Sequence, residues 1–407
     1  MDDIEMKPAL LFLVHRIPFP PNKGDKIRSY NMMKELSKDF DIHLGCFIDD
    51  HEDIGFEPEL LQFCKSVKCI QQNKLLCKVK GLQGFLSNKA ITLPYYSSAE
   101  MQKWTNETIS QNQIQRVLVF SAAMAQFVEQ HLSQLRHTVL DFVDVDSDKW
   151  RQYASEKSGI KAWFYNREAR LLQDYEVQMT ETFDASTFVS DDEAGMFKTM
   201  LADNLKDKVS GVRNGVDTSY FDPKSDFKKV ESISENSIVF TGAMDYWANV
   251  NAVIWFTDNV WPLVLAAKPD AHFYIVGSNP TSKVQALNGK QNITVTGRVE
   301  DVRPYIEQTK LSIAPLQIAR GTQNKVLEAL SMAKPIVLSS MAAEGINKPS
   351  TADYQVQDDA SAMAKLITDL LEQGIVVSQQ NRAFVIEHFS WESEMHKFTD
   401  LLNGVTG

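Results

Sequence analysis

The sequence predicts an α/β protein made of two doubly wound parallel sheets. Short apolar runs of strand length alternate with helical segments from Ala9 to about residue 211, and the alternation starts again near Ser237. Such alternation is typical of parallel strands covered by helices. A chain of 407 residues has room for two domains with complete cores.

In the first half, the apolar run Ala9–Val14 predicts a buried strand, and an amphipathic helix is expected to follow it. Further helices are expected at Ala122–Leu132 and over roughly residues 147–182. The other predicted strands are Asp41–Ile48, Ser66–Ile70, Arg116–Phe120, Thr138–Val143, Ala185–Ser190 and a segment within Lys208–Val216.

In the second half, three of the predicted strands end in glycine, at Gly242, Gly277 and Gly297. A glycine directly after a parallel strand lets the backbone approach a ligand at the carboxyl edge of the sheet. Tight-turn geometry explains any single one of them equally well, but three in successive units favour a ligand site. The predicted strands are Ser237–Gly242, His272–Gly277, Asn292–Gly297, Leu311–Leu316 and Pro335–Ser340.

Polar, charged and turn-forming residues between the halves predict an exposed linker over residues 213–236. We therefore expect a first domain over residues 1–212 and a second over residues 237–385, facing each other across a cleft. The amphipathic segment 386–407 is expected to pack back on the first domain.

Composition narrows the classes of function. A formal net charge of -11 argues against a nucleic-acid-binding protein. The acidic start is not typical of a secretory signal, and no apolar run reaches the roughly 18 residues of a membrane-spanning helix. Cys46, Cys64, Cys69 and Cys77 fit no zinc-binding spacing, so buried or idle thiols in a reducing cytoplasm are expected.

Several motifs carry a family resemblance over nearly the whole chain. "VRNGVDTSYFDP", "VFTGAMDYWANVNAVIWF", "YIVGSNP", "VTGRVEDVRPYI" and "APLQIARGTQNKVLEALSMAKPIVLSSMAAEGI" occur in order. They resemble the nucleotide-sugar half of retaining glycosyltransferases of family 4, which have the GT-B fold. "HRIPFPPNKGDKIRSYNMMKEL" and "LDFVDVDSDKWRQYA" resemble the sugar transferases associated with exosortase and exopolysaccharide loci.

The polar turn at Arg320–Lys325, at the mouth of a predicted helix that runs to about Ala333, is the best candidate for the donor site. A diphosphate leaving group needs cations or aligned N–H groups, which Arg320, Lys325 and the turn residues Gly321, Thr322, Gln323 and Asn324 can offer. The resemblance implies that Glu328 binds the ribose hydroxyls of the donor. A solvated carboxylate paired to Lys325 is the alternative.

The sequence departs from the family pattern at two places in this site. The family's first glutamate, which contacts the donor sugar, is replaced by Arg320, and the usual Arg and Lys after the first strand of the domain are missing. We expect Arg320 or Lys325 to supply the missing positive charge. Arg298 is a further candidate cation, although a surface pair with Asp301 explains it equally well.

The acceptor side is predicted in the first domain. Gly24 and Asp25 lie in the loop that opens the first helix, where Gly24 would let the chain approach the acceptor; a plain left-handed turn is the alternative. Lys23, Lys26 and Arg28 add positive charge there, or form a solvated helix surface. His15 follows the first strand and could assist the reaction, or could be a hydrogen-bonded core histidine.

The D-x-D sequence of Asp144 and Asp146 has several possible roles. We expect these carboxylates to line the acceptor site or to cap the helix that follows. A metal site is the less favoured alternative. An EF-hand is excluded, because Lys149 and Ser155 stand where the loop needs glycine and glutamate.

The segment Leu60–Ala99 contains six lysines and no acidic residue. Its basic, partly amphipathic character is typical of a surface that lies on an anionic membrane, and a solvated basic face is the alternative. We therefore expect a cytoplasmic protein, peripheral on the inner face of the cell membrane.

The resemblance implies a transferase that needs neither a metal nor a cofactor and that retains the anomeric configuration. It would move a sugar, with retention, from a nucleoside diphosphate sugar to a glycan or lipid-linked acceptor in exopolysaccharide or cell-surface glycan biosynthesis. A non-catalytic nucleotide-sugar-binding protein and a nucleotide-sugar epimerase of the same fold are the alternatives.

Overall fold

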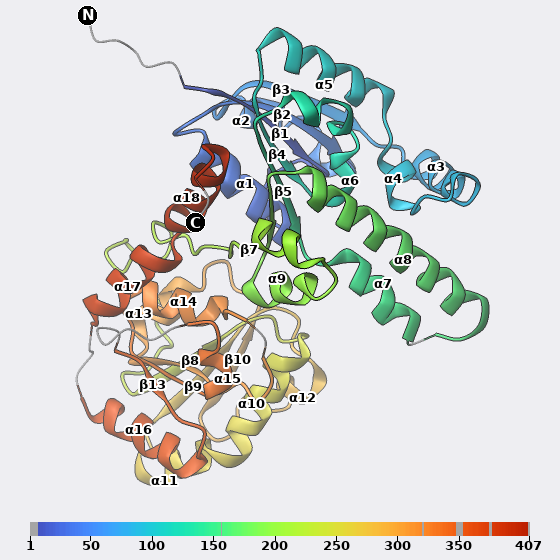
Figure 1. Ribbon diagram of the computed structural model, residues 1–407. Coiled ribbons are helices and arrows are strands. Elements are labelled where there is room, and N and C mark those ends of the chain that lie inside the picture. The colour runs from blue at the N-terminus through green and yellow to red at the C-terminus, as the bar shows by residue number, and fades with distance from the viewer. Residues whose placement is uncertain (1–6, 156, 320, 347–352, 374–376, 406–407) are drawn as a thin grey trace, which may run out of the picture. The chain divides into compact units, whose positions relative to one another are not determined.

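The computed structural model describes residues 7–155, 157–319, 321–346, 353–373 and 377–405 (Figure 1). The chain forms two compact units, Met1–Asn214 together with Glu394–Gly407, and Gly215–Ser393. Each unit has its own hydrophobic core, built on its own sheet.

The first unit contains a fully parallel seven-stranded sheet of order β3-β2-β1-β4-β5-β6-β7. The central strands are buried on both faces, as the apolar runs predicted, because helices cover both sides of the sheet. The strands are β1 (Ala9–Val14), β2 (Asp41–Ile48), β3 (Cys64–Gln71), β4 (Arg116–Phe120), β5 (His137–Val143), β6 (Ala185–Phe188) and β7 (Val209–Gly211).

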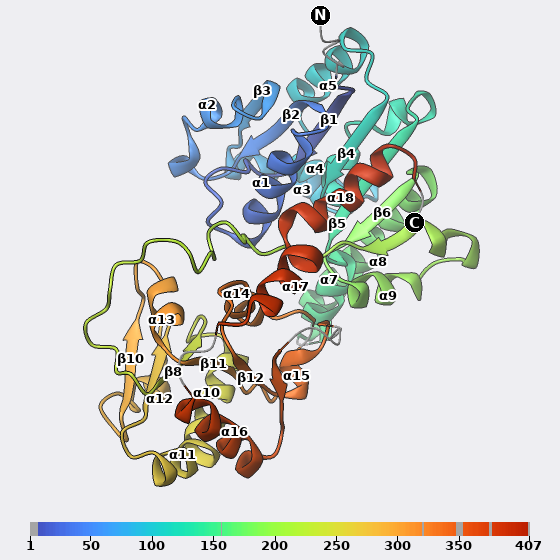
Figure 2. The same cartoon turned by 90° about the vertical axis from the view of Figure 1, so that its left-hand side faces the viewer.

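Figures 1 and 2 show α1 (Gly24–Leu36) and α18 (Trp391–Leu402) on one face of this sheet and α5 (Ala99–Gln111) and α8 (Gly159–Thr182) on the other. The remaining helices of the unit are α2 (Glu57–Leu60), α3 (Lys74–Ser87), α4 (Thr92–Tyr96), α6 (Ala122–Ala125), α7 (Asp146–Ser155) and α9 (Asp191–Lys198), with short 3-10 helices at His51–Asp53, Glu129–Gln134 and Asp203–Lys208.

The second unit contains a parallel six-stranded sheet of order β10-β9-β8-β11-β12-β13. Its strands are β8 (Ser237–Thr241), β9 (His272–Val276), β10 (Ile293–Gly297), β11 (Leu311–Ala314), β12 (Ile336–Leu338) and β13 (Gln355–Val356). Its helices are α10 (Trp247–Asn259), α11 (Trp261–Ala267), α12 (Ser282–Gln285), α13 (Arg303–Gln308), α14 (Asn324–Ser331), α15 (Ser340–Ala343), α16 (Ala360–Glu372) and α17 (Gln379–Phe389).

Three predicted helices differ from the observed ones. The segment Ala122–Leu132 forms only the one-turn α6, followed by a 3-10 helix. The region 147–182 is two helices, because Gly159 takes a positive φ of 63° where α8 begins. The segment 386–407 was expected to pack on the first domain as a whole. Instead, α17 ends within the second unit, and only the chain from Glu394 onward belongs to the first unit.

No single helix among the described residues is long and apolar enough to cross a membrane; α10 and α11 together meet the length and composition requirement, with a bend of 41° between them.

Candidate functional sites

The strand orders locate one candidate site in each unit. In both sheets the direction of winding reverses next to the first strand, between β1 and β4 and between β8 and β11. Doubly wound sheets bind ligands at the carboxyl ends of the strands at this reversal. The residues that follow these four strands are therefore the first candidates.

Of the three glycines predicted from the sequence, Gly242 and Gly277 directly follow β8 and β9, Gly297 is the last residue of β10, and backbone hydrogen bonds link these strand ends. The Gly242 N–H donates to the Val276 carbonyl at 3.0 Å, and the Gly277 N–H donates to the Gly297 carbonyl at 3.2 Å. A Cβ atom on Gly277 would lie 1.7 Å from the Gly242 carbonyl oxygen. No side chain fits there, so Gly277 is required by packing. The ligand-binding role of the three glycines stays a prediction.

Lys325 and Asn249 border Gly242. The Lys325 Cε atom lies 3.4 Å from the place that a Cβ on Gly242 would take, and its Nζ atom lies 5.7 Å from the Phe240 ring centroid. Asn249, on α10, donates from Nδ2 to the Ala243 carbonyl at 2.9 Å. Its buried Oδ1 atom has no hydrogen-bond partner in the part of the chain that the structure describes. An ammonium group and an open amide oxygen therefore stand at the carboxyl end of β8.

Burial brings the pKa values of Lys325 and Glu328 toward neutrality. It lowers the pKa of the Lys325 ammonium to about 8 and raises the pKa of the Glu328 carboxyl to about 7, while the attraction between the two groups opposes each shift. The two residues are three apart on α14, yet no ion pair joins them. The alternative of a solvated Glu328 carboxylate paired to Lys325 is therefore wrong.

The polar turn lies directly before α14. The helix begins at Asn324 and ends at Ser331, so Gly321 and Thr322 precede it and the first-turn N–H groups start with Asn324. The Gln323 side chain donates to the Gly321 carbonyl at 3.1 Å, and the Thr322 hydroxyl donates to the Gly345 carbonyl at 3.4 Å. Gly321 and Thr322 therefore stand at the mouth of α14, as predicted, and their contacts with an anion stay a prediction.

Arg320 lies outside the described residues, and its role stays a prediction. Arg298 is exposed after β10. Asp301 does not pair with Arg298: it forms a salt bridge with Arg303 at 2.7 Å, and the Arg303 guanidinium lies 3.7 Å from the Tyr220 ring centroid. The surface-pair alternative for Arg298 is therefore wrong, while its role as a cation for the donor stays a prediction.

His15 and Asp25 lie together at the reversal point of the first sheet. His15 follows β1, its ring stacks on Phe120 at the end of β4 at 5.7 Å, and its Nε2 atom lies 3.4 Å from Asp25 Oδ2. The buried Nδ1 atom has no partner among residues 7–155 or the later described ranges. Burial raises the pKa of Asp25, but the hydrogen bond from His15 and the charge of Arg16 outweigh it and lower that pKa to about 2.

Arg16, Asp49 and Tyr96 complete this group and were not singled out in the sequence. Arg16 donates to Asp25 at 2.5 Å and to both oxygens of Asp49 at 2.9 Å. The Tyr96 ring lies edge-on to His15, with 6.1 Å between centroids. The available signal for Arg16 was its position two residues after β1, at the reversal point of the sheet. Asp49 and Tyr96 come from distant segments of the chain and gave no such signal.

Three acceptor-side expectations are corrected by the structure. Arg28 is 1% exposed and binds both oxygens of Asp141, at 2.8 and 3.1 Å, so it is neither a surface cation nor free to bind an acceptor. Lys26 is equally buried and pairs with Asp53 at 2.8 Å. Gly24 begins α1 without a positive φ, so the alternative of a left-handed turn is wrong, and an approach of this loop to the acceptor stays a prediction.

The two carboxylates of the D-x-D sequence are linked by one lysine. Lys149 Nζ lies 2.8 Å from Asp144 and 3.1 Å from Asp146, which is the first residue of α7. Within the described ranges, no group of three or more His, Cys, Asp and Glu side chains gathers in a way that could hold a metal ion. Whether Asp144 and Asp146 line the acceptor site stays a prediction.

In the segment Leu60–Ala99, helix α3 is packed in an unusual orientation. Its small residues Cys77, Gly81 and Gly84 are buried, whereas its large apolar side chains are turned outward. Leu75 is 74% exposed and Leu82 is 63% exposed. An amphipathic helix of a water-surrounded protein normally does the opposite.

Residues 235–373 match the family model described as Glycosyl transferases group 1. This range starts just before β8 and includes Gly242, Lys325 and Glu328. No curated protein sequence matches the chain.

Solved structures are similar to the chain over nearly its whole length. A glycosyltransferase from Rickettsia africae has a TM-score of 0.61 and 16% identity, with 98% of each chain covered. Anabaena Alr3699/HepE, solved in complex with UDP-glucose, has a TM-score of 0.57 and 11% identity, with 97% of this chain and 99% of that chain covered. Sucrose-phosphate synthase from Thermosynechococcus elongatus has a TM-score of 0.60 and 14% identity, with 98% and 99% covered.

Together with the two parallel sheets, these similarities define the fold as the GT-B fold of glycosyltransferases, as the sequence predicted. The match to the glycosyltransferase group 1 model lies within the second unit.

Proposed function

We propose that the protein is a retaining glycosyltransferase that moves a sugar from a nucleoside diphosphate sugar to a lipid-linked or glycan acceptor. The second unit would bind the donor and the first unit the acceptor. The family resemblance favours a place in exopolysaccharide or cell-surface glycan synthesis, at the cytoplasmic face of the cell membrane.

The observation that carries this proposal is the position of Lys325 beside Gly242, at the reversal point of the second sheet, with Glu328 three residues further along α14. Both groups are held in surroundings that disfavour their charges, and neither forms an ion pair with any residue that the structure describes. A diphosphate would stabilise the ammonium, and ribose hydroxyls would donate to the carboxylate.

In the proposed reaction, the bond between the sugar C1 atom and the diphosphate oxygen breaks, and a bond forms between C1 and the acceptor oxygen on the same face. Negative charge grows on the leaving diphosphate, where Lys325 stabilises it. The acceptor proton passes to a phosphate oxygen of the leaving group. No protein carboxylate is assigned as a covalent nucleophile.

A panel of UDP-, GDP-, ADP- and dTDP-sugars, incubated with and without membrane lipid extract, tests the proposal. Transfer or slow hydrolysis of one donor supports it, and the anomeric configuration of the product, read by NMR, tests retention. Conversion of the donor to its epimer without any acceptor would identify an epimerase. Binding of a nucleotide sugar without turnover would identify a non-catalytic binding protein.

The affinity for a nucleoside diphosphate is expected to fall as the pH rises through 8. The pKa of Lys325 is lowered to about 8 by burial, so the ammonium that attracts the phosphate loses its proton above that pH. At about pH 9.5 the affinity should be roughly tenfold weaker than at pH 7. Isothermal titration calorimetry measures this change. A Lys325→Arg variant should show a flat profile, and a flat wild-type profile would contradict the assignment.

Replacing Glu328 with glutamine is expected to weaken nucleoside diphosphate binding by about tenfold, because hydrogen bonds to a charged acceptor contribute about 1.5–3 kcal/mol. Competition by inorganic pyrophosphate should remain unchanged, since pyrophosphate has no ribose. Equal losses for both ligands would place Glu328 at the diphosphate instead.

The outward-facing residues of α3 are expected to bind vesicles that contain anionic lipid. Sedimentation with phosphatidylcholine vesicles, with and without phosphatidylglycerol, measures the bound fraction. The exposed Leu75→Asp and Val79→Asp changes should together reduce binding roughly tenfold. A matched Leu263→Asp change at the exposed face of α11 should have no effect. If the α3 changes left vesicle binding unaltered, α3 would be a solvated basic face and not a membrane-binding surface.

A further inference from the structure

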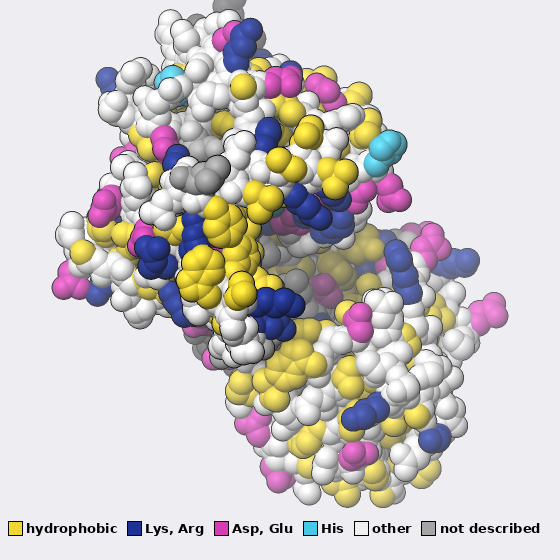
Figure 3. Space-filling view, turned by 90° about the vertical axis from the view of Figure 1, so that its right-hand side faces the viewer, with side chains coloured by type: hydrophobic (Ala, Val, Ile, Leu, Met, Phe, Trp, Pro, Cys, Tyr) yellow, Lys and Arg dark blue, Asp and Glu magenta, His cyan; other side chains and the backbone are white. Residues whose placement is uncertain are grey.

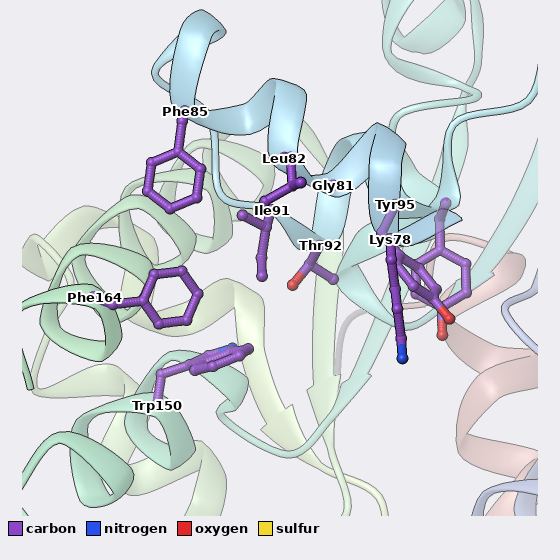
Figure 4. Close-up of a pocket in the computed structure, with 10 residues that line it drawn as sticks. Lys78, Gly81, Leu82, Phe85, Ile91, Thr92, Tyr95, Trp150 and Phe164 are labelled. Atoms are coloured by element: carbon purple, nitrogen blue, oxygen red, sulfur yellow. The ribbon is translucent and has the colours of Figure 1, made fainter. Parts of the chain in front are cut away.

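The first unit contains an apolar cavity of about 440 Å³ beside α3, and the reaction chemistry described above does not use it. This volume lies within the range of sites that bind small molecules. Its walls come from α3 and α4 on one side and from α7 and α8 on the other (Figure 4). All of these helices belong to the first unit, so the cavity is complete within it.

The two ends of the cavity differ in polarity. Figure 4 shows Phe85, Phe164 and Trp150 at one end, where the Phe85 and Phe164 rings stack at 5.8 Å. Lys78 and Tyr95 lie at the other end. Between them the wall is formed by apolar side chains such as Ile91. A ligand that fits must therefore be apolar over most of its length and polar, with negative charge, at one end.

The polar end of the cavity adjoins the candidate acceptor group. Tyr96 also lines the cavity, and its ring lies 6.1 Å from the His15 ring, which contacts Asp25. A molecule whose polar end lies at Lys78 and Tyr96 would therefore present that end toward His15. The apolar end is bordered by the outward-facing Leu82 of α3.

We propose that this cavity binds the hydrocarbon chain next to the phosphate of a lipid-linked acceptor, with the phosphate at Lys78 and the sugar-accepting end toward His15. This inference rests on the proposed transferase function and adds the acceptor's chemical class and its binding site. The chain is held by apolar burial, and the ammonium of Lys78 attracts the phosphate.

The surface around the cavity fits a ligand that is delivered from a membrane. Ile160 and Trp163, at the start of α8, are 86% and 61% exposed. Figure 3 shows hydrophobic side chains gathered on this face, with Lys and Arg side chains beside them. No acidic residue occurs between Leu60 and Ala99. A long alkyl phosphate in an anionic membrane matches this pattern of apolar and positive groups.

Two tryptophans allow the cavity and the outer surface to be probed separately. Trp150 lines the cavity, whereas Trp163 is exposed outside it. The probe is 11-bromoundecyl phosphate, because its bromine atom quenches the fluorescence of an indole ring that it contacts. It is used below its critical micelle concentration. We expect saturable quenching that Trp150→Phe abolishes and Trp163→Phe leaves intact. Dodecyl phosphate should compete, and inorganic phosphate should not.

Lys78 and Lys74 provide a matched pair for the phosphate end. Both are exposed lysines of α3, but only Lys78 lines the cavity. Lys78→Gln should weaken the affinity for the bromoalkyl phosphate by about tenfold, and Lys74→Gln should leave it unchanged. Three results would each overturn the proposal and indicate adsorption at the surface instead. These are quenching that depends on Trp163 rather than Trp150, equal effects of the two lysine changes, and quenching that does not saturate.

The test of the lipid-binding cavity can fail or succeed independently of the test of the transferase function. Chain binding is measured without any nucleotide sugar, and donor use is measured by the donor panel. Cavity binding without donor turnover would refute the transferase function and leave the lipid site standing. Donor hydrolysis without cavity binding would leave a transferase whose acceptor is held elsewhere.

Discussion

Replacing Lys325 with alanine is expected to lower kcat/KM for the sugar donor by about 10²–10³-fold, which is the usual cost of removing one group that stabilises charge in a transition state. The ammonium stands beside Gly242 at the carboxyl end of β8, in surroundings that disfavour an uncompensated charge. Its attraction to the leaving diphosphate is therefore stronger than that of a solvated lysine. Initial rates over a range of donor concentrations measure the loss.

Lys283→Ala is the matched control, because Lys283 is an exposed lysine on α12 of the same unit. Its kcat/KM should equal that of the wild type. A Lys325→Ala enzyme with unchanged kcat/KM would show that another cation holds the diphosphate, and Arg320 and Arg298 would then be the candidates to test.

Replacing Asp141 with alanine is expected to lower the free energy of unfolding of the first unit by about 3–5 kcal/mol. Arg28 and Asp141 are both almost completely buried, and Asp141 also accepts a hydrogen bond from the Thr187 hydroxyl at 2.9 Å. Removing the carboxylate leaves the Arg28 guanidinium buried without its ion-pair partner. Urea denaturation followed by circular dichroism measures the loss.

The exposed pair of Lys365 and Asp369 serves as the comparison, since surface pairs contribute little. Asp369→Ala should leave the denaturation curve unchanged. A double change of Arg28→Met and Asp141→Leu should recover much of the lost stability, because it removes both charges together. If Asp141→Ala behaved like Asp369→Ala, the burial of the pair would be contradicted.

The strands were the most predictable part of the structure. Ala9–Val14, Asp41–Ile48 and Arg116–Phe120 have the predicted bounds, because continuous apolar runs of strand length are typical of sheets covered on both faces. The apolar composition of Ala122–Leu132 predicted a single helix there, but α6 ends after one turn and a 3-10 helix follows. Composition does not specify such an ending.

The burial of charged residues was not predictable. A charged residue such as Arg28 is normally expected at the surface. Its partner Asp141 is 113 residues away in the sequence, so only the folded sheet brings the two together. The same holds for Lys26 and Asp53. The basic character of the segment around α3 was visible in the sequence, but the outward orientation of Leu75 depends on how α3 packs.

The donor site was partly predictable. Gly242, Lys325 and Glu328 were singled out by residue type and by resemblance, and the structure places Lys325 beside Gly242. Asn249 was missed, because a single amide on a helix has no distinguishing pattern in the sequence. Its open Oδ1 atom becomes apparent only from the burial around it.

The most direct test of this account is a crystal structure of the protein with the nucleoside diphosphate that the donor panel selects. We predict that the diphosphate lies at the carboxyl ends of β8 and β11, within hydrogen-bonding distance of Lys325 Nζ, and that Glu328 accepts from a ribose hydroxyl. A nucleotide bound at the carboxyl ends of β1 and β4, or one that leaves Lys325 without contact, would contradict the central claim.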